Sequence, residues 1–286
     1  MKKILYLVLL FLTLNVGAKD LSVVSFNIKW IGYSDDRKNH DLAKMLSQHD
    51  IVFIQEMVSP PVNGFYPSGK PYKKDKESSD FLNAMLNEGF SYALSIEDSG
   101  TGDNNETNSA STEWSIAFYK ADNVLLKEHY YIEEDRTNHD NYERVPYLFY
   151  FENKYSGNDY KFINVHLKPS NGLKDRERRR QELNSIFTWI NLNNYNEKDF
   201  IILGDMNIYD CDRLNNWIPK NYYRPDKECS GTNLDMSKPY DQVIVYEKIN
   251  IEDVHVINLY DYFKKIDTKT FKSYYSDHHP IQFYLK

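Results

Sequence analysis

Short apolar segments recur along this 286-residue chain, and several end in a polar side chain that can bind a metal or carry a proton. The clearest is 200–203, which is followed by Gly204, Asp205 and Asn207 and is typical of a buried strand. A lone Asp at a strand end is usually a turn residue. However, nine residues share this placement: Asn27, Glu56, Glu113, His166, Asp205, Asn207, Asp241, Asp277 and His278. Because adjacent strands can bring their ends together on one rim, we expect these side chains to gather there.

The rest of the pattern predicts strands interspersed with helices. Strands are expected over 21–27, 50–57, 91–96, 113–120 and 240–246, with a hairpin over 146–167 and a last strand after His278. Helices are expected over 39–50, over 78–90 with Ser79 as the cap, and over 174–192 with Leu183, Ile186, Phe187 and Ile190 as the buried stripe. The polar segment 97–112 predicts a loop. Neither a linker nor a repeat divides residues 19–286, so we expect one domain.

Residues 1–18 have the features of a secretory signal peptide. Two lysines precede an apolar run over 4–14, and small side chains over 16–18 precede Lys19. The apolar run is too short to span a bilayer, so we expect a secreted or periplasmic protein with no stable membrane association. Cys211 and Cys229 are the two cysteines of the chain. An even number in an exported protein predicts a disulfide.

The charge balance constrains how a phosphate-bearing substrate could bind. The chain has 35 basic and 42 acidic side chains; without Lys2 and Lys3 of the expected signal peptide the counts are 33 and 42, a net charge of −9. A field of this sign repels polyanions, so a bound cation or a local basic patch must offset it. The segment 174–180 is either such a patch or a solvated helix face, and its sequence favours neither.

The strand-end residues favour a hard divalent cation beside two histidines that transfer protons. Mg²⁺, Mn²⁺ or Ca²⁺ suits the carboxylate and amide oxygens of Glu56, Asp205, Asn207, Asn27 and Asp277 better than Zn²⁺ does. His166 and His278 each have a possible carboxylate partner, Glu113 and Asp241. A carboxylate on one ring nitrogen leaves the other free for proton transfer. Two such pairs beside a cation suit hydrolysis of a phosphoester. His279 is expected to be structural, because alternation points it elsewhere.

These residues lie in motifs that resemble those of the endonuclease/exonuclease/phosphatase superfamily. In sequence order the motifs are SFNIKW, DIVFIQEM, NVHLK, ILGDMN, YDQVIV and SDHHP, and the resemblance runs from Leu21 to Lys286. GDxN together with a terminal SDHxP is a specific combination. Within the superfamily the chain is most similar to deoxyribonuclease I. The resemblance implies an α/β fold of four layers, in which a two-sheet β-sandwich is flanked by helices.

The resemblance also implies a role for each residue. Catalysis is assigned to His166, His278, Glu113, Asp241 and Asp205. Metal binding is assigned to Glu56, Asp205, Asn207, Asn27 and Asp277. Substrate contacts are assigned to Asn207, Asn27 and Arg144, which lies where the family keeps a phosphate-contacting arginine. Cys211 and Cys229 lie where deoxyribonuclease I has a disulfide.

The expected protein is a monomeric, metal-dependent nuclease that hydrolyses DNA with little sequence preference. Two residues of deoxyribonuclease I are not matched: an arginine expected near Val58 and a tyrosine expected in the SAST stretch before Glu113. The segment 57–77 is also longer and holds four prolines. The alternatives are therefore a phosphodiesterase or phosphatase acting on another phosphoester, such as sphingomyelin or a phosphoinositide, and an inactive binding module. The intact histidines and carboxylates argue against the last.

Overall fold

The computed structural model describes residues 20–33, 36–109, 111–193 and 200–286. The expected signal peptide, residues 1–18, lies outside these residues. The first of two six-stranded sheets has the order β13 (Ile251–Val256), β14 (Ile281–Leu285), β1 (Leu21–Ile31), β2 (Ile51–Met57), β6 (Ile116–Tyr119), β5 (Ser91–Leu94). The second has the order β11 (Tyr222–Tyr223), β12 (Asp241–Tyr246), β10 (Phe200–Asp205), β9 (Asp159–His166), β8 (Tyr147–Asn153), β7 (Val124–Tyr131). A two-stranded sheet joins β3 (Gly64–Phe65) to β4 (Pro71–Tyr72).

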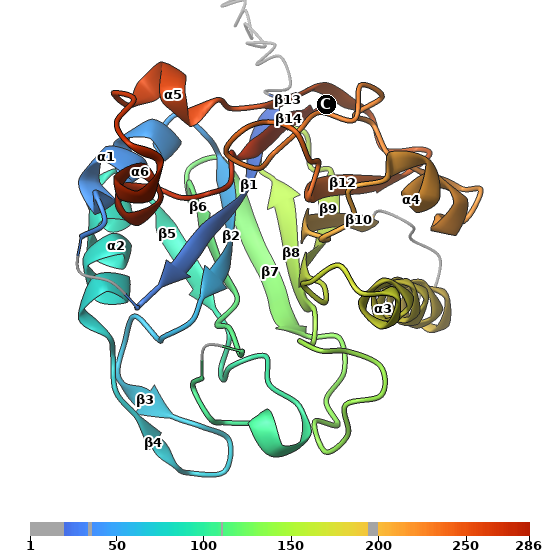
Figure 1. The fold of residues 1–286 in the computed structure, drawn as a ribbon, viewed down its shortest axis with the longest axis horizontal. Helices are drawn as coiled ribbons and strands as arrows, with labels where there is room; N and C mark the ends of the chain where they lie inside the picture. The colour runs from blue at the N-terminus through green and yellow to red at the C-terminus, as the bar shows by residue number, and fades with distance from the viewer. Residues whose placement is uncertain (1–19, 34–35, 110, 194–199) are drawn as a thin grey trace, which may run out of the picture.

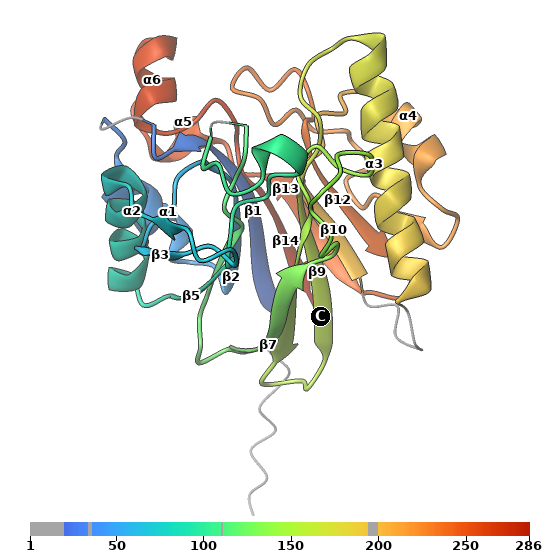
Figure 2. The same ribbon diagram turned by 90° about the horizontal axis from the view of Figure 1, so that it is seen from below.

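Helices cover the outer side of each large sheet (Figure 1). Beside the first sheet lie α1 (Asn39–Leu46), α2 (Lys76–Asn87), α5 (Leu259–Tyr262) and α6 (Thr268–Tyr274). Beside the second lie α3 (Leu173–Leu192) and α4 (Cys211–Trp217), and Figure 2 shows α3 running along that side. These four layers confirm the predicted two-sheet α/β sandwich. No helix among the described residues is both long and apolar enough to cross a membrane.

Alternation along β1 explains how the first sheet packs on both faces. Leu21 and Val23 belong to the core between the two sheets, whereas Val24 and Phe26 belong to the core under α1 and α2. Successive side chains of a strand point to opposite faces, so a strand buried on both sides is apolar at nearly every position. Ser25 and Asn27 continue the series that faces the opposite sheet, so this row changes from apolar to buried polar side chains toward Asn27.

All three predicted helices are present, but the one predicted over 39–50 ends at Leu46, and one predicted cap is wrong. The predicted stripe of α3 is buried at Leu183, Ile186, Phe187 and Ile190. In α2, however, Asp75 is the N-cap and accepts a hydrogen bond from Ser78 N at 3.0 Å, so the predicted Ser79 cap is wrong. The Ser79 hydroxyl instead donates to Pro61 O at 2.5 Å. A helix can begin at either residue by preference alone, and the tertiary contact of Ser79 places it within the first turn.

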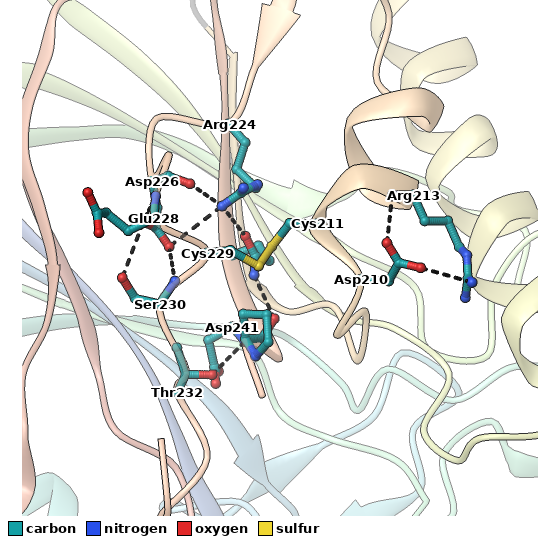
Figure 3. Close-up of a disulfide and its surroundings, with 12 residues drawn as sticks. Asp210, Cys211, Arg213, Arg224, Asp226, Glu228, Cys229, Ser230, Thr232 and Asp241 are labelled. Carbon is teal, nitrogen blue, oxygen red and sulfur yellow. Dashed lines mark hydrogen bonds and ion pairs between the residues drawn. A yellow bond between two sulfur atoms is a disulfide. The ribbon is translucent and has the colours of Figure 1, made fainter. Parts of the chain in front are cut away.

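The predicted disulfide joins Cys211 at the start of α4 to Cys229, and it closes a segment that leads to Asp241 (Figure 3). Next to the disulfide, Asp226 accepts from Ser230 N at 2.8 Å. Further on, the buried Thr232 accepts from Asp241 N at 2.9 Å through its hydroxyl. The disulfide therefore anchors the chain that leads to the first residue of β12.

Replacing both cysteines with alanine should lower the free energy of unfolding by about 3 kcal/mol in the chain-entropy model. The reason is that the bond removes conformational freedom from an unfolded loop whose ends are 18 residues apart. Urea unfolding of the oxidised wild type and the double variant measures the difference, with reduced wild type as the control. Equal midpoints for the oxidised protein and the variant would show that the bond contributes nothing.

Candidate active site

The strand ends that carry the predicted residues meet at one edge of the sandwich. In the second sheet Asp205 is in register with His166 on β9 and with Asp241 on β12. In the first sheet β1 and β2 are parallel, and Asn27 is in register with Gln55, so Glu56 follows immediately. The parallel strands end here and the antiparallel β12 begins here. The fold thereby brings together side chains that are distant in the sequence.

Asn27 connects the two sheets at this edge. Its side-chain nitrogen donates to Glu56 Oε1 at 2.8 Å and to Asp205 Oδ2 at 2.9 Å. Its side-chain oxygen accepts from Lys29 N at 3.0 Å. Asn27 and Asp205 are almost fully buried. In this arrangement Asn27 holds the two carboxylates with its nitrogen, and its oxygen is occupied by the backbone.

Glu56 has an unusual backbone conformation that other site residues maintain. Its φ is 63°, in the left-handed region, where a non-glycine residue costs about 1–3 kcal/mol. Glu56 N donates to Glu113 Oε2 at 3.0 Å, and Glu56 Oε2 accepts from Trp30 N at 2.9 Å. Asn207 is also left-handed, with φ 53°, and its N donates to Asp205 Oδ1 at 2.9 Å. Two predicted site residues therefore have strained backbones, and these hydrogen bonds offset the strain.

Both predicted histidine–carboxylate pairs are present. His166 Nδ1 lies 2.6 Å from Glu113 Oε1, and His278 Nδ1 lies 2.7 Å from Asp241 Oδ2. The two free nitrogens face one atom, because His166 Nε2 lies 3.6 Å and His278 Nε2 3.8 Å from Asp205 Oδ2. The site thus has two oriented imidazoles on either side of a central carboxylate.

Burial and neighbouring charges oppose each other in these groups. Burial by itself would lower the pKa of His278, but the Asp241 carboxylate and its hydrogen bond, together with Asp205 and Asp277, raise it to about 10. Burial would raise the pKa of the Glu113 carboxyl, but His166 and Arg144 hold it well below its usual range. The pKa values of Glu56 and Asp205 are raised, chiefly by burial. The last two carboxylates would therefore gain most from a nearby cation.

The donor set fits a hard divalent cation. Glu56, His166 and Asp205 offer ligand atoms within 4.8 Å of one another, and Asp205, Asp241 and His278 form a second such group. Asp241 Oδ1 is buried and has no hydrogen-bond partner among the described residues. Carboxylate oxygens with at most one imidazole suit Mg²⁺, Mn²⁺ or Ca²⁺. Glu56 and Asp205 are the residues best placed to hold such an ion.

Other predicted residues lie near these groups or beside them. Arg144 Nε lies 2.9 Å from Glu113 Oε1, which places its guanidinium next to the first histidine pair. Asn207 donates its side-chain N–H to Leu167 O at 3.2 Å. Asp277 lies outside both ligand groups, and its Oδ2 is 3.7 Å from Lys272 Nζ. His279 is fully buried; its Nδ1 accepts from Leu259 N at 3.0 Å, as expected of a structural residue.

Sequence reasoning did not identify two polar contacts that support the site. Gln55 lies one residue before Glu56, and Asn164 lies two residues before His166. Gln55 Nε2 donates to Asn164 Oδ1 at 2.6 Å, and this buried hydrogen bond joins the two sheets. Glu182 is a fully buried carboxylate of α3. Gln55 and Asn164 stand between apolar strand residues, a pattern that signals a buried polar pair only when its partner is known. Glu182 was hidden in a segment rich in charges of both signs.

A cavity of about 480 Å³ opens beside His278. Its lining includes Asp277, Tyr240, Lys265 and Lys272. The Tyr240 ring lies 5.8 Å from the His278 ring, centroid to centroid. This volume is within the usual range for ligand sites. The cavity gives a substrate group room next to the second histidine pair.

Comparison with known proteins identifies the family. The model of the Endonuclease/Exonuclease/phosphatase family matches residues 24–278. No curated protein matches the chain significantly. The match spans most of the chain and includes both histidine pairs.

Solved structures with the same fold have low sequence identity to this chain. The human Nocturnin catalytic domain with bound sulfate is 16% identical, with a TM-score of 0.62 over 93% of this chain and 94% of that one. A mannosyl-6-phosphatase of Bacteroides thetaiotaomicron is 15% identical, with a TM-score of 0.60 over 93% and 99%. TDP2 of D. rerio, complexed with a single-strand DNA product, is 14% identical, with a TM-score of 0.57 over 93% and 99%. At these identities the structures show a common fold, and together with the family match they establish that this chain belongs to the endonuclease/exonuclease/phosphatase family.

Proposed function

We propose that this chain is an exported, Mg²⁺- or Mn²⁺-dependent nuclease that hydrolyses DNA phosphodiesters with low sequence specificity. The observation that carries the proposal is the pair of oriented histidines whose free nitrogens lie 3.6 and 3.8 Å from Asp205 Oδ2. The family supports the coarser class of phosphoester hydrolase. The disulfide between Cys211 and Cys229 supports export, because such bonds persist in oxidising compartments.

The histidines and Asp205 can divide the proton transfers of hydrolysis between them. An attacking water must lose a proton, and the leaving oxygen must gain one. His278 is suited to donate, since Asp241, together with Asp205 and Asp277, raises its pKa to about 10 against the effect of burial and so keeps it protonated at neutral pH. Asp205 Oδ2 is suited to orient the water, and His166 Nε2, which lies 3.6 Å from that oxygen, is suited to accept the proton of the water. When bound by Glu56 and Asp205, the divalent cation supplies positive charge that stabilises the phosphate oxygens as negative charge develops.

Exposed residues beside Glu56 favour a nucleic acid among the possible substrates. Trp30 and Tyr33 are 50% and 72% exposed, and their ring centroids lie 6.1 Å apart. Lys29 Nζ lies 5.9 Å from the Trp30 ring. Aromatic rings that stack on bases, with cations that contact the backbone, are the usual means of binding single strands. The TDP2 complex adds an example of this fold with a single-strand DNA product.

The alternative function is hydrolysis of another phosphoester. The mannosyl-6-phosphatase neighbour favours this alternative, because that protein has the same fold and its name refers to a sugar phosphate as the substrate. A lipid substrate has less support. The cavity beside His278 is lined mostly by polar and aromatic side chains, with Leu234 as its aliphatic member. A lipid headgroup could occupy such a cavity more readily than an acyl chain.

Metal dependence is the first test. Chelation should abolish activity, and added Mg²⁺ or Mn²⁺ should restore it. The same ions should raise the melting temperature of the wild type, because a ligand that binds the folded state stabilises it, by about 2.7 kcal/mol at 100 times Kd. Glu56→Gln and Asp205→Asn should lose most of this shift, whereas the exposed control Glu177→Gln should keep it. Full activity after exhaustive chelation would exclude the metal.

The histidines provide the second test. His166→Ala and His278→Ala should each lower kcat by about 10²- to 10⁴-fold, the typical contribution of one acid or base. Because both would serve one reaction, the double variant should lose less than the product of the single losses. His279→Ala is the matched control for position and should retain activity if it folds. Near-wild-type cleavage by both single variants would refute the assignment.

Substrate choice is the third test. Wild type should nick supercoiled plasmid at many sites, because contacts to the DNA backbone carry no sequence information. Trp30→Ala should raise KM for single-stranded DNA by about 5- to 160-fold with less change in kcat, given about 1–3 kcal/mol per stacked base. Parallel assays use sphingomyelin, a phosphoinositide and mannose 6-phosphate. Activity on one of these alone would retain the chemistry and reject DNA.

A further inference from the structure

The arginine-rich start of α3 contacts protein backbone rather than forming an open basic surface. Arg178 donates to the carbonyl oxygens of His139 and Asp140. Arg179 is 1% exposed and donates to Lys168 O and Ser170 O, each at 2.7 Å. Two loops therefore end at this helix: the loop that contains Arg144, and the loop that follows His166.

Glu182, one turn further along α3, joins the same two loops. Its Oε1 accepts from Glu143 N at 2.7 Å, and its Oε2 accepts from Lys168 N at 2.9 Å. Glu143 immediately precedes Arg144, and Lys168 is two residues after His166. The Glu182 carboxylate thus binds the backbone next to Arg144 and close to His166, two residues whose side chains contact the Glu113 carboxylate.

The loops also contact each other beside this carboxylate. Lys168 Nζ lies 2.7 Å from Glu143 Oε1, so the two residues whose N–H groups bind Glu182 form an ion pair. Ser170 has φ 83°, a strained conformation for a residue with a side chain, and Arg179 holds its carbonyl. The contacts constrain the loops in relation to the helix and to each other.

Burying the Glu182 carboxylate costs free energy, and packing alone does not explain why a carboxylate occupies this position. The residue is 0% exposed, and burial of a carboxylate raises its pKa, a shift that the two backbone N–H groups oppose. A buried ion is expensive unless it is fully hydrogen-bonded. An apolar residue would fill the same space but would leave both N–H groups without acceptors.

We propose that Glu182 is a positioning residue: by accepting from Glu143 N and Lys168 N, it fixes the two loops so that Arg144 and His166 converge on Glu113. His166 Nδ1 and Arg144 Nε lie 2.6 and 2.9 Å from the same oxygen, Glu113 Oε1. A small shift of either loop would therefore change the orientation of the first imidazole. The inference rests on the proposed hydrolase function for its kinetic consequence, but its structural claim is independent of the substrate.

Glu182→Gln is the test variant, because glutamine has nearly the same shape but offers one acceptor oxygen instead of two. It should lower kcat about 10- to 100-fold, as expected for a misplaced catalytic group, with KM within about threefold of wild type. Hydrogen exchange of metal-free protein should be faster in peptides that contain Glu143 or Lys168 and unchanged elsewhere. Glu177→Gln, an exposed residue of the same helix that pairs with Arg180, is the control and should match wild type in both measurements.

Each other outcome overturns the proposal. Uniformly faster exchange, with a loss of kcat that equals the loss of folded protein, would make Glu182 a general stabilising residue. Faster exchange confined to the peptides that contain Glu143 or Lys168, with unchanged kcat, would show that the loops are fixed for another reason. A loss of kcat without faster exchange in these peptides would show that Glu182 acts by another route. If wild type hydrolyses no phosphoester, the proposed function fails. In that case exchange alone still decides whether Glu182 fixes the loops.

Discussion

Contact between aromatic side chains of the two sheets sets the geometry on which the site depends. Phe53 of β2 lies 4.9 Å from Phe162 and 5.5 Å from Phe149 between ring centroids, across the interface of the sandwich. Because close-packed interiors resist displacement, this contact fixes how far one sheet can slide over the other. The register of β9, β10 and β12 then determines which residues face the edge. The active-site constellation is the consequence of two sheets held in one alignment.

The centre of the site combines features that would each destabilise an ordinary protein. Asp205 is a buried carboxylate and Glu56 a partly buried one, and both accept from the amide nitrogen of Asn27. Glu56 also has a left-handed backbone. Burial and strain of this kind are typical of sites whose charge is completed by a ligand. The same features that cost folding energy thus leave the site ready for a cation.

The surroundings of the site show how charge is arranged at two scales. Over the whole chain acidic residues outnumber basic ones, which disfavours binding of polyanions at a distance. Near the site, Lys29, Lys265 and Lys272 accompany exposed or cavity-lining aromatic rings. Two of the four arginines of α3, Arg178 and Arg179, are by contrast used in holding loops. Attraction of a phosphate substrate is therefore local. For residues 174–180 the sequence offered a basic patch or a solvated helix face, and neither alternative included the holding of loops.

The sequence by itself determined the strands that end in polar residues, the cysteine pair and the histidine–carboxylate candidates, because alternation and motif spacing are local properties of the chain. The layered α/β class followed from the resemblance of its motifs to those of a known family. The sequence could not determine that Asn27 would bridge the carboxylate of Glu56 and that of Asp205, which lies 178 residues after Asn27 in the sequence. Nor could it show that Asp277 would lie beside Lys272, outside the two ligand groups, or that Glu182 would be buried within a charged segment. Those outcomes depend on which loops meet across the fold. A side chain's partner in such a meeting is decided by tertiary packing, since no local pattern records the distance between two remote segments.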